Sequence, residues 1–186
     1  WNFKAGGAAV ANTDGTINSQ VSVNNTLGFS IASYTGNGIA GSTVGHGLDS
    51  TPEMVIVKSI TTTANGSWSV YHIETGATKS IALEQATTPF TDVGYWNNTS
   101  PTASVFSLGT YAVANQSSAN YIAYNFTSKP GFSKVGSYTG SGVVGNTVMT
   151  VFEPAFVIIK KSSGTGEWYM FDNKRLTGSY SDQLAA

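Results

Sequence analysis

The chain has 186 residues, of which 40% are hydrophobic and 10% are charged, whereas about 25% of the residues in an average domain are charged. Nine Lys and Arg stand against ten Asp and Glu, and the net charge of −1 gives no basic surface for nucleic acid or anionic lipid. The lack of cysteine excludes disulfides, thiol nucleophiles and cysteine-based zinc sites, and no apolar run approaches the roughly 18 residues of a membrane-spanning helix. We therefore expect a globular protein with no nucleic-acid partner and no membrane insertion.

Residues 1–27 are predicted to contain the end of a preceding unit, followed by a connector. The first four residues, WNFK, resemble the YNFT of Tyr124 to Thr127 and so correspond to the last strand of an earlier unit. Ala5 to Leu27 is rich in small and polar residues, and only Ile17 to Val23 alternates between apolar and polar positions. This segment predicts an inserted hairpin or an extended connector.

Residues 28–127 are predicted to form a first β unit, because their landmarks return in the same order later in the chain. GFSIASYTGNG, which starts at Gly28, returns as GFSKVGSYTGSG at Gly131; TPEMVIVK returns as EPAFVIIK, and GSWSVYH as GEWYMFD. Such an order indicates a tandem repeat. Residues 128–186 lack counterparts of YWNNTSPTASVFSLG and YIAYNF, so we interpret them as a second, incomplete unit and the chain as an excerpt from a longer array.

The repeated segments have the pattern of β-strands. MVIVK and FVIIK are short β-branched runs, and the two tryptophan-containing segments alternate aromatic and aliphatic side chains. SVFSLG and YIAYNF add two strands, the glycines of YTGNG and YTGSG predict a hairpin turn or a bulge, and no stretch has a helical apolar stripe. We predict an all-β fold of tandem antiparallel β-sandwiches, jelly-roll-like, in repeats of about 100 residues. Tyr34 and Tyr138, and likewise Trp68 and Trp168, are then expected to have related surroundings.

Residues suited to catalysis or metal binding are few. His46 lies between glycines, but the second unit does not keep it, and we interpret it as a structural loop residue. His72 corresponds to Asp172, and both are interpreted as caps at a strand end. The acidic residues include no close pair framed by apolar residues, although two carboxylates need only meet in space. With no nucleophile elbow, phosphate loop or calcium loop, we predict no catalytic residue, no cofactor and no metal.

The tryptophans divide into two kinds. Trp68 and Trp168 recur at equivalent positions, which favours filling of the core over a platform for a sugar. Trp96 is followed by Asn97 and Asn98, and an aromatic ring beside two amides is the kind of surface that binds glycans. These three residues are therefore the candidate glycan contacts, although the same residues are also ordinary turn formers.

In their order and spacing, these motifs resemble a repeated domain of uncharacterised function in tail fibre and tail-associated proteins of bacteriophages, many of them marine. The resemblance covers nearly the whole chain, including the segment after KAGG. It implies a virion component, assembled outside the membrane, with recognition of the host surface as its task. It brings no catalytic signature and no binding residues that can be transferred to this sequence.

We accordingly expect a non-enzymatic structural protein, located in the virion or outside the cell, that forms a homo-oligomer. Its expected partners are copies of itself, other virion proteins or a host-surface glycan. Two alternatives stay open: a glycan depolymerase of a phage tail, which requires paired carboxylates or a histidine with an acid in a groove, and a filament or surface-layer component of a cell.

Overall fold

The computed structural model describes residues 5–61 and 66–174, and in this part of the chain the fold is all-β, as the sequence predicts, with antiparallel sheets and two single-turn helices. The strands are β1 (Val10–Asn12), β2 (Ser19–Asn24), β3 (Phe29–Thr35), β4 (Ser42–Gly45), β5 (Met54–Ser59), β6 (Trp68–His72), β7 (Lys79–Ala82), β8 (Phe90–Thr91), β9 (Val105–Leu108), β10 (Asn120–Phe126), β11 (Phe156–Lys160) and β12 (Trp168–Asp172). The helices are α1 (Val93–Trp96) and α2 (Ala112–Asn115). No described helix is long and apolar enough to cross a membrane.

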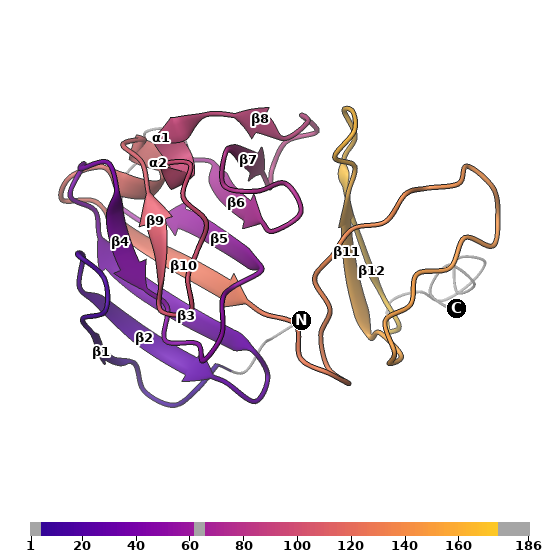
Figure 1. Cartoon of the computed structure of the whole chain (residues 1–186), viewed down its shortest axis with the longest axis horizontal. Helices are drawn as coiled ribbons and strands as arrows, with labels where there is room; N and C mark the ends of the chain where they lie inside the picture. The colour runs from indigo at the N-terminus through magenta and orange to yellow at the C-terminus, as the bar shows by residue number, and fades with distance from the viewer. Residues whose placement is uncertain (1–4, 62–65, 175–186) are drawn as a thin grey trace.

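An eight-stranded sheet forms the main body, in the order β1-β2-β3-β10-β5-β6-β7-β8 (Figure 1). All of its neighbouring strands are antiparallel. Strand β10 lies at its centre, where it pairs with β3 along one edge and with β5 along the other. A strand that comes late in the sequence therefore joins the two halves of the sheet.

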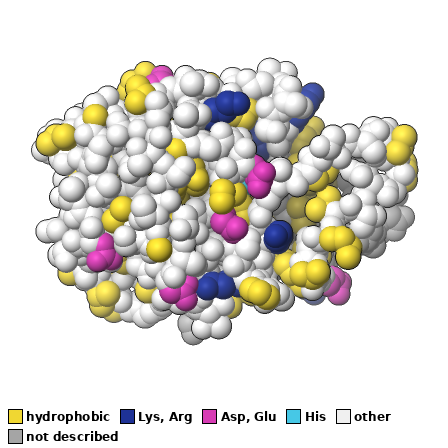
Figure 2. Space-filling model, in the orientation of Figure 1, with side chains coloured by type: hydrophobic (Ala, Val, Ile, Leu, Met, Phe, Trp, Pro, Cys, Tyr) yellow, Lys and Arg dark blue, Asp and Glu magenta, His cyan; other side chains and the backbone are white. Residues whose placement is uncertain are grey.

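A second layer covers one face of this sheet and encloses the core. Strands β4 and β9 form a two-stranded ladder, and their Val44 and Phe106 are fully buried against the sheet. Successive side chains of a strand point to opposite faces, so alternate residues such as Tyr34 and Tyr121 meet this layer. The ring of Tyr34 stacks on Tyr121 at 5.2 Å between centroids and meets Phe106 edge-on at 6.1 Å. Figure 2 shows an outer surface on which charged side chains are sparse, in keeping with the composition.

The prediction that YTGNG closes a hairpin or a bulge is wrong, because this segment crosses from the sheet to the second layer. Strand β3 is bonded to β2 and β10, whereas β4 is bonded to β9. A Cβ atom on Gly36 would lie 2.5 Å from the carbonyl oxygen of Gln116, so only glycine fits where the two backbones touch. The buried side chain of Asn115 holds the crossing in place.

The segment between Ala5 and Leu27 contributes strands to the same sheet. Strands β1 and β2 form an antiparallel hairpin, and Val21 of β2 lies opposite Ala32 of β3. The boundary expected between residues 27 and 28 thus falls inside one continuous sheet. The resemblance of Trp1 to Lys4 to a last strand lies outside the described residues.

The C-terminal part, residues 128–174, contains a single hairpin, β11–β12, to the right of the sheet in Figure 1. The second GFS…YTG phrase lies before it and forms no strand among the described residues. Tyr138 is 50% exposed, whereas Tyr34 is 4% exposed, so the expectation of related surroundings fails for this pair. The physical reason is that β3 lies between β2 and β10, and no described strand flanks residues 133–139.

The hairpins β5–β6 and β11–β12 have the same register. Met54 pairs with His72 and Lys58 with Trp68, while the corresponding Phe156 pairs with Asp172 and Lys160 with Trp168. In each hairpin the lysine ammonium donates a hydrogen bond to a glycine carbonyl, that of Gly66 in the first and Gly166 in the second.

Backbone conformation also matches in the turns that precede the two hairpins. Gly38 and its counterpart Gly142 have φ of 73° and 72°, and Gly41 and its counterpart Gly145 have φ of 79° and 92°. These values lie in the left-handed region that glycine adopts at little cost. These glycines therefore keep left-handed φ at equivalent positions, although the second phrase forms no strand.

Candidate functional site

The candidate glycan contacts lie at the end of α1, and burial corrects the interpretation of Trp96. Its side chain is 1% exposed and meets Tyr71 edge-on at 6.1 Å between centroids, so no ring face is open to a sugar. Asn97 is half-buried and Asn98 exposed, and both have left-handed φ, of 52° and 51°. The Asn97 amide closes the helix by donating to the Val93 carbonyl at 3.0 Å.

A short signal in the sequence accounts for the burial of Trp96. The Asp92 carboxylate accepts a hydrogen bond from the amide of Gly94 at 2.8 Å and caps the N-terminus of α1. Asp is one of the residues preferred at the N-cap of a helix, so Asp92 is a local signal for a helix start at Val93. The resulting helical turn directs Trp96 inward, where the sequence interpretation had placed a loop.

The two histidines have structural surroundings. His46 is fully buried; its Nδ1 accepts from the amide of Leu48 at 3.1 Å, and its Nε2 lies 3.2 Å from the carbonyl of Thr102, to which it donates. Burial lowers the pKa of His46. His72 Nδ1 accepts from the amide of Glu74 at 3.2 Å, just after β6, as expected for a cap. No group of three or more potential metal ligands occurs in the described part of the chain.

Three acidic residues of the main body bind the start of the C-terminal part. Their partners lie within residues 128–137, which follow β10. The contacts are the Asp49 carboxylate with Lys129 Nζ at 3.1 Å, Glu53 with the backbone amide of Ser128 at 2.5 Å, and Glu74 with the hydroxyl of Ser137 at 3.0 Å. These carboxylates therefore join the main body to the C-terminal part through one ion pair and two hydrogen bonds.

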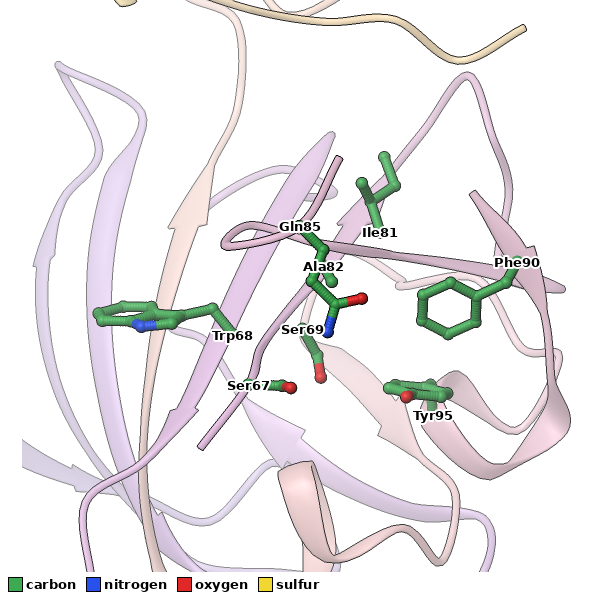
Figure 3. A pocket seen from close by; sticks show the side chains of 8 residues that line it. All are labelled: Ser67, Trp68, Ser69, Ile81, Ala82, Gln85, Phe90 and Tyr95. Atoms are coloured by element: carbon green, nitrogen blue, oxygen red, sulfur yellow. The ribbon is translucent and has the colours of Figure 1, made fainter. Parts of the chain in front are cut away.

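A small pocket of about 80 Å³ lies among β6, β7, β8 and α1 (Figure 3). Its polar lining comes from Ser67, Ser69 and Gln85, and the Phe90 and Tyr95 rings stand on one side, edge-on at 5.2 Å between centroids. Trp68 also borders the pocket, but its ring points away and stacks on Tyr124 at 6.3 Å.

The hydroxyl of Ser69 gives this pocket a chemical preference. Ser69 is 1% exposed, and its Oγ has no hydrogen-bond partner among the described residues. An unpaired buried hydroxyl costs about 1–3 kcal/mol, which a guest with its own hydrogen-bonding group would recover. Burial, and next the Asp92 carboxylate, raise the pKa of Tyr95, whose phenol therefore remains a donor at neutral pH. The space, about that of two or three waters, suits one small neutral substituent, such as a hydroxymethyl group.

Sequence reasoning missed these pocket residues. Ser69 lies in β6 and Tyr95 in α1, and these two elements come together only in the folded protein. Neither residue is part of a recognisable sequence motif. The second hairpin reaches the same region: the Trp168 indole donates to the Ala82 carbonyl at 2.9 Å, and the Gly166 amide to Ala86 at 2.8 Å.

The fold and its contacts define an all-β module in which a second hairpin, of the same register as β5–β6, is hydrogen-bonded to the main body. The whole chain, residues 1–186, matches the model of the family described as Domain of unknown function (DUF7483), and the chain belongs to this family. Neither the curated proteins nor the solved structures gave a match.

Proposed function

We propose that this chain is a non-enzymatic structural module of a bacteriophage tail fibre or tail-associated appendage, built from tandem copies of one β-sandwich unit. The first unit comprises residues 28–127 and the second residues 128–186, with residues 1–27 as the end of a preceding unit and a connector whose strands β1 and β2 join the sheet of the first unit. In this proposal the module is part of the virion, and it assembles with copies of itself or with other virion proteins.

One observation carries the proposal, namely that two separate hairpins have the same register and the same lysine-to-glycine hydrogen bond. A repeated register requires that the same sequence pattern select the same pairing twice, because a slip of one residue would move every side chain to the opposite face. A protein assembled from copies of one block gains length by stacking like units, which suits an extended appendage.

The acidic contacts support a structural role over the depolymerase alternative. Asp49, Glu53 and Glu74 bind residues 128–137, so these carboxylates are engaged in joining neighbouring segments. A glycosidase pair instead needs two carboxyl groups that face one another across a substrate groove. The low charge and the lack of cysteine also suit a particle that must persist outside the cell without redox chemistry.

Attachment to a host glycan is the second part of the proposal, and the Ser69 pocket is the observation that favours it. An aromatic wall beside hydroxyl and amide groups matches the apolar face and the hydroxyl edge of a neutral sugar. Asn97 and Asn98 remain predicted contacts of such a ligand. A glycan array probed with the intact chain tests this part, with the Ser69→Val variant, which removes the hydroxyl and narrows the pocket while keeping a residue suited to a strand, as the control that should lose binding.

The structural role is tested by electron microscopy of particles that contain this chain, labelled with an antibody against it. Label at fixed positions along a tail appendage is expected. Label on a cellular filament or surface layer, or release of reducing ends from a host polysaccharide by the purified chain, would contradict the proposal.

A further inference from the structure

The C-terminal part exposes apolar residues whose counterparts are buried in the main body. Figure 2 shows hydrophobic side chains gathered on the right-hand part of the molecule, where the hairpin lies. In the first GFS…YTG phrase and the segment after it, Phe29, Tyr34 and Val44 are 3%, 4% and 0% exposed. Their counterparts in the second phrase and the segment after it, Phe132, Tyr138 and Val148, are 42%, 50% and 44% exposed.

In the main body, strand β10 packs against the two aromatic residues of this set, Phe29 and Tyr34. Phe126 of β10 lies opposite Phe29, with ring centroids 4.9 Å apart, and Tyr121 lies opposite Tyr34 and stacks on it at 5.2 Å. The exposed aromatic residues of the C-terminal part are therefore those that a strand like β10 would contact.

Strand β11 is the second neighbour that such a strand would have. Its counterpart β5 pairs with β6 on one edge and with β10 on the other, whereas in residues 5–61 and 66–174 only β12 pairs with β11. Val55 and Val57 of β5 are fully buried, but the corresponding Val157 and Ile159 are only half-buried.

The backbone groups that face the open edge of β11 follow from alternation along the strand. Just after β5, the amide of Ile60 donates to the carbonyl of Asn120 at 2.9 Å, so positions two and four residues earlier also face β10. These are Lys58 and Ile56, whose counterparts in β11 are Lys160 and Ile158. The edge thus offers the backbone groups of Ile158 and Lys160 to an incoming strand.

We propose that the C-terminal part is completed by a strand of the β10 type, supplied by another module of the same family, which inserts between β11 and residues 132–139. The strand runs antiparallel to β11, and its residue equivalent to Tyr124 lies opposite Ile158, as Tyr124 lies opposite Ile56. The inference rests on the proposed function, because it assumes that the second unit copies the first.

The partner is defined by its chemistry. Addition of a strand to an exposed sheet edge gains main-chain hydrogen bonds, and alternate side chains decide which strand fits. In β10 the core-facing residues Tyr121 and Ala123 are fully buried, while Ile122 and Tyr124 on the opposite face are half-buried. A suitable strand therefore has an aromatic and a small residue on one face and an aliphatic and an aromatic residue on the other.

The test uses the full chain and a fluorescent synthetic peptide with the sequence of Ser118 to Ser128, SANYIAYNFTS. Saturable binding is expected by fluorescence polarisation, with slower amide hydrogen exchange at Ile158 and Lys160 in the complex. A scrambled peptide of the same composition should not bind. Protection confined to β5 would mean that the peptide displaces the chain's own β10, and this result would overturn the inference.

Two proline variants locate the binding edge. Ile158→Pro removes an amide that faces the open edge, a position where proline is compatible with a strand, and is expected to weaken peptide binding at least about tenfold. Val144→Pro, at a fully exposed position, should bind like the parent chain. If Ile158→Pro also disturbs the hairpin, exchange at Val157 and Ile159 reveals it, and the scrambled peptide and the site of protection still decide the outcome.

Self-association of the chain is a further informative result. Dimers that protect Ile158 and Lys160 and that Ile158→Pro disrupts would support the inference, with a second copy as the source of the strand. Absence of peptide binding, in a chain whose β3 and β5 amides remain protected, would overturn it. That failure would leave the labelling of tail appendages unaffected, so the strand completion and the proposed function fail separately.

Discussion

Replacement of Asn115 by alanine tests how the two layers of the main body are joined. The side chain is fully buried and makes four hydrogen bonds, three to the crossing between β3 and β4 and one to Gly109, just after β9. Its carbonyl oxygen accepts from the amides of Asn37 and Gly38 at 3.0 and 3.3 Å, and its amide nitrogen donates to the carbonyls of Ile39 and Gly109 at 3.0 and 2.8 Å.

The expected loss follows from the number and burial of these bonds. Each contributes about 1 kcal/mol net, and a polar group left unpaired and buried costs about 1–3 kcal/mol. Because only the bond to Gly109 is fully buried, water can reach the other three groups in part. We therefore expect Asn115→Ala to lower the free energy of unfolding by about 3 kcal/mol, and Tm by about 10 °C.

Urea unfolding followed by tryptophan fluorescence measures this loss, since the buried Trp96 reports on the core. The m-value should not change, because the variant exposes no additional surface on unfolding. Asn173→Ala, at an exposed position, is the matched control and should stay within about 0.5 kcal/mol of the parent. A loss below about 1 kcal/mol for Asn115→Ala would refute the view that this amide joins the layers.

Three further predictions follow from the contacts and burial of single residues. Gly36→Ala should cost at least about 2 kcal/mol, because its Cβ would meet the Gln116 backbone, whereas Gly140→Ala at the corresponding position, with nothing within 4 Å, should be near neutral; a similar loss in both would contradict the assignment. Burial lowers the pKa of His46 from its ordinary value of 6.5, so the unfolded state takes up a proton first as pH falls. The contribution of His46 to stability should hence be constant well above pH 6.5 and fall as pH drops through 6.5, and a His46→Gln variant whose unfolding free energy falls as steeply as that of the parent between pH 7.5 and 5.5 would disprove this. Ser69→Ala should not lower the free energy of unfolding and should raise it by up to about 1–3 kcal/mol, because the hydroxyl has no described partner to lose and its unpaired burial is relieved; a loss in thermal unfolding would show that the group is satisfied.

Local patterns in the sequence predicted several of the strands, because side-chain alternation and turn residues act over a few positions, but they did not identify β3 or β4 as strands. The segments MVIVK and SWSVYH form β5 and β6 as adjacent antiparallel strands, and FVIIK and EWYMFD form the second hairpin. The order of the strands in the sheet could not be predicted from local patterns. Strand β10 lies between β3 and β5 although it is distant from both in the sequence, and its position depends on which apolar faces pack together in the folded protein.

The difference between local patterns and tertiary contacts also explains why the predictions for YTGNG and Trp96 are wrong. The glycines of YTGNG were identified as turn residues, but whether a turn joins paired strands or crosses between layers depends on tertiary partners. Trp96 was interpreted from its polar neighbours, whereas the Asp92 cap decides that its ring points inward. The Ser69 pocket has no local signal, because its lining comes from four separate elements.

If one β block occurs twice in this chain, as we propose, the second copy needs a β10-type strand to bury its apolar residues. A crystal structure of the full chain with the SANYIAYNFTS peptide tests it most directly. We expect the peptide to lie between β11 and residues 132–139, and Phe132 and Tyr138 to become as buried as Phe29 and Tyr34. A peptide bound elsewhere, or a β11–β12 pairing that no longer places Lys160 opposite Trp168, would contradict the claim.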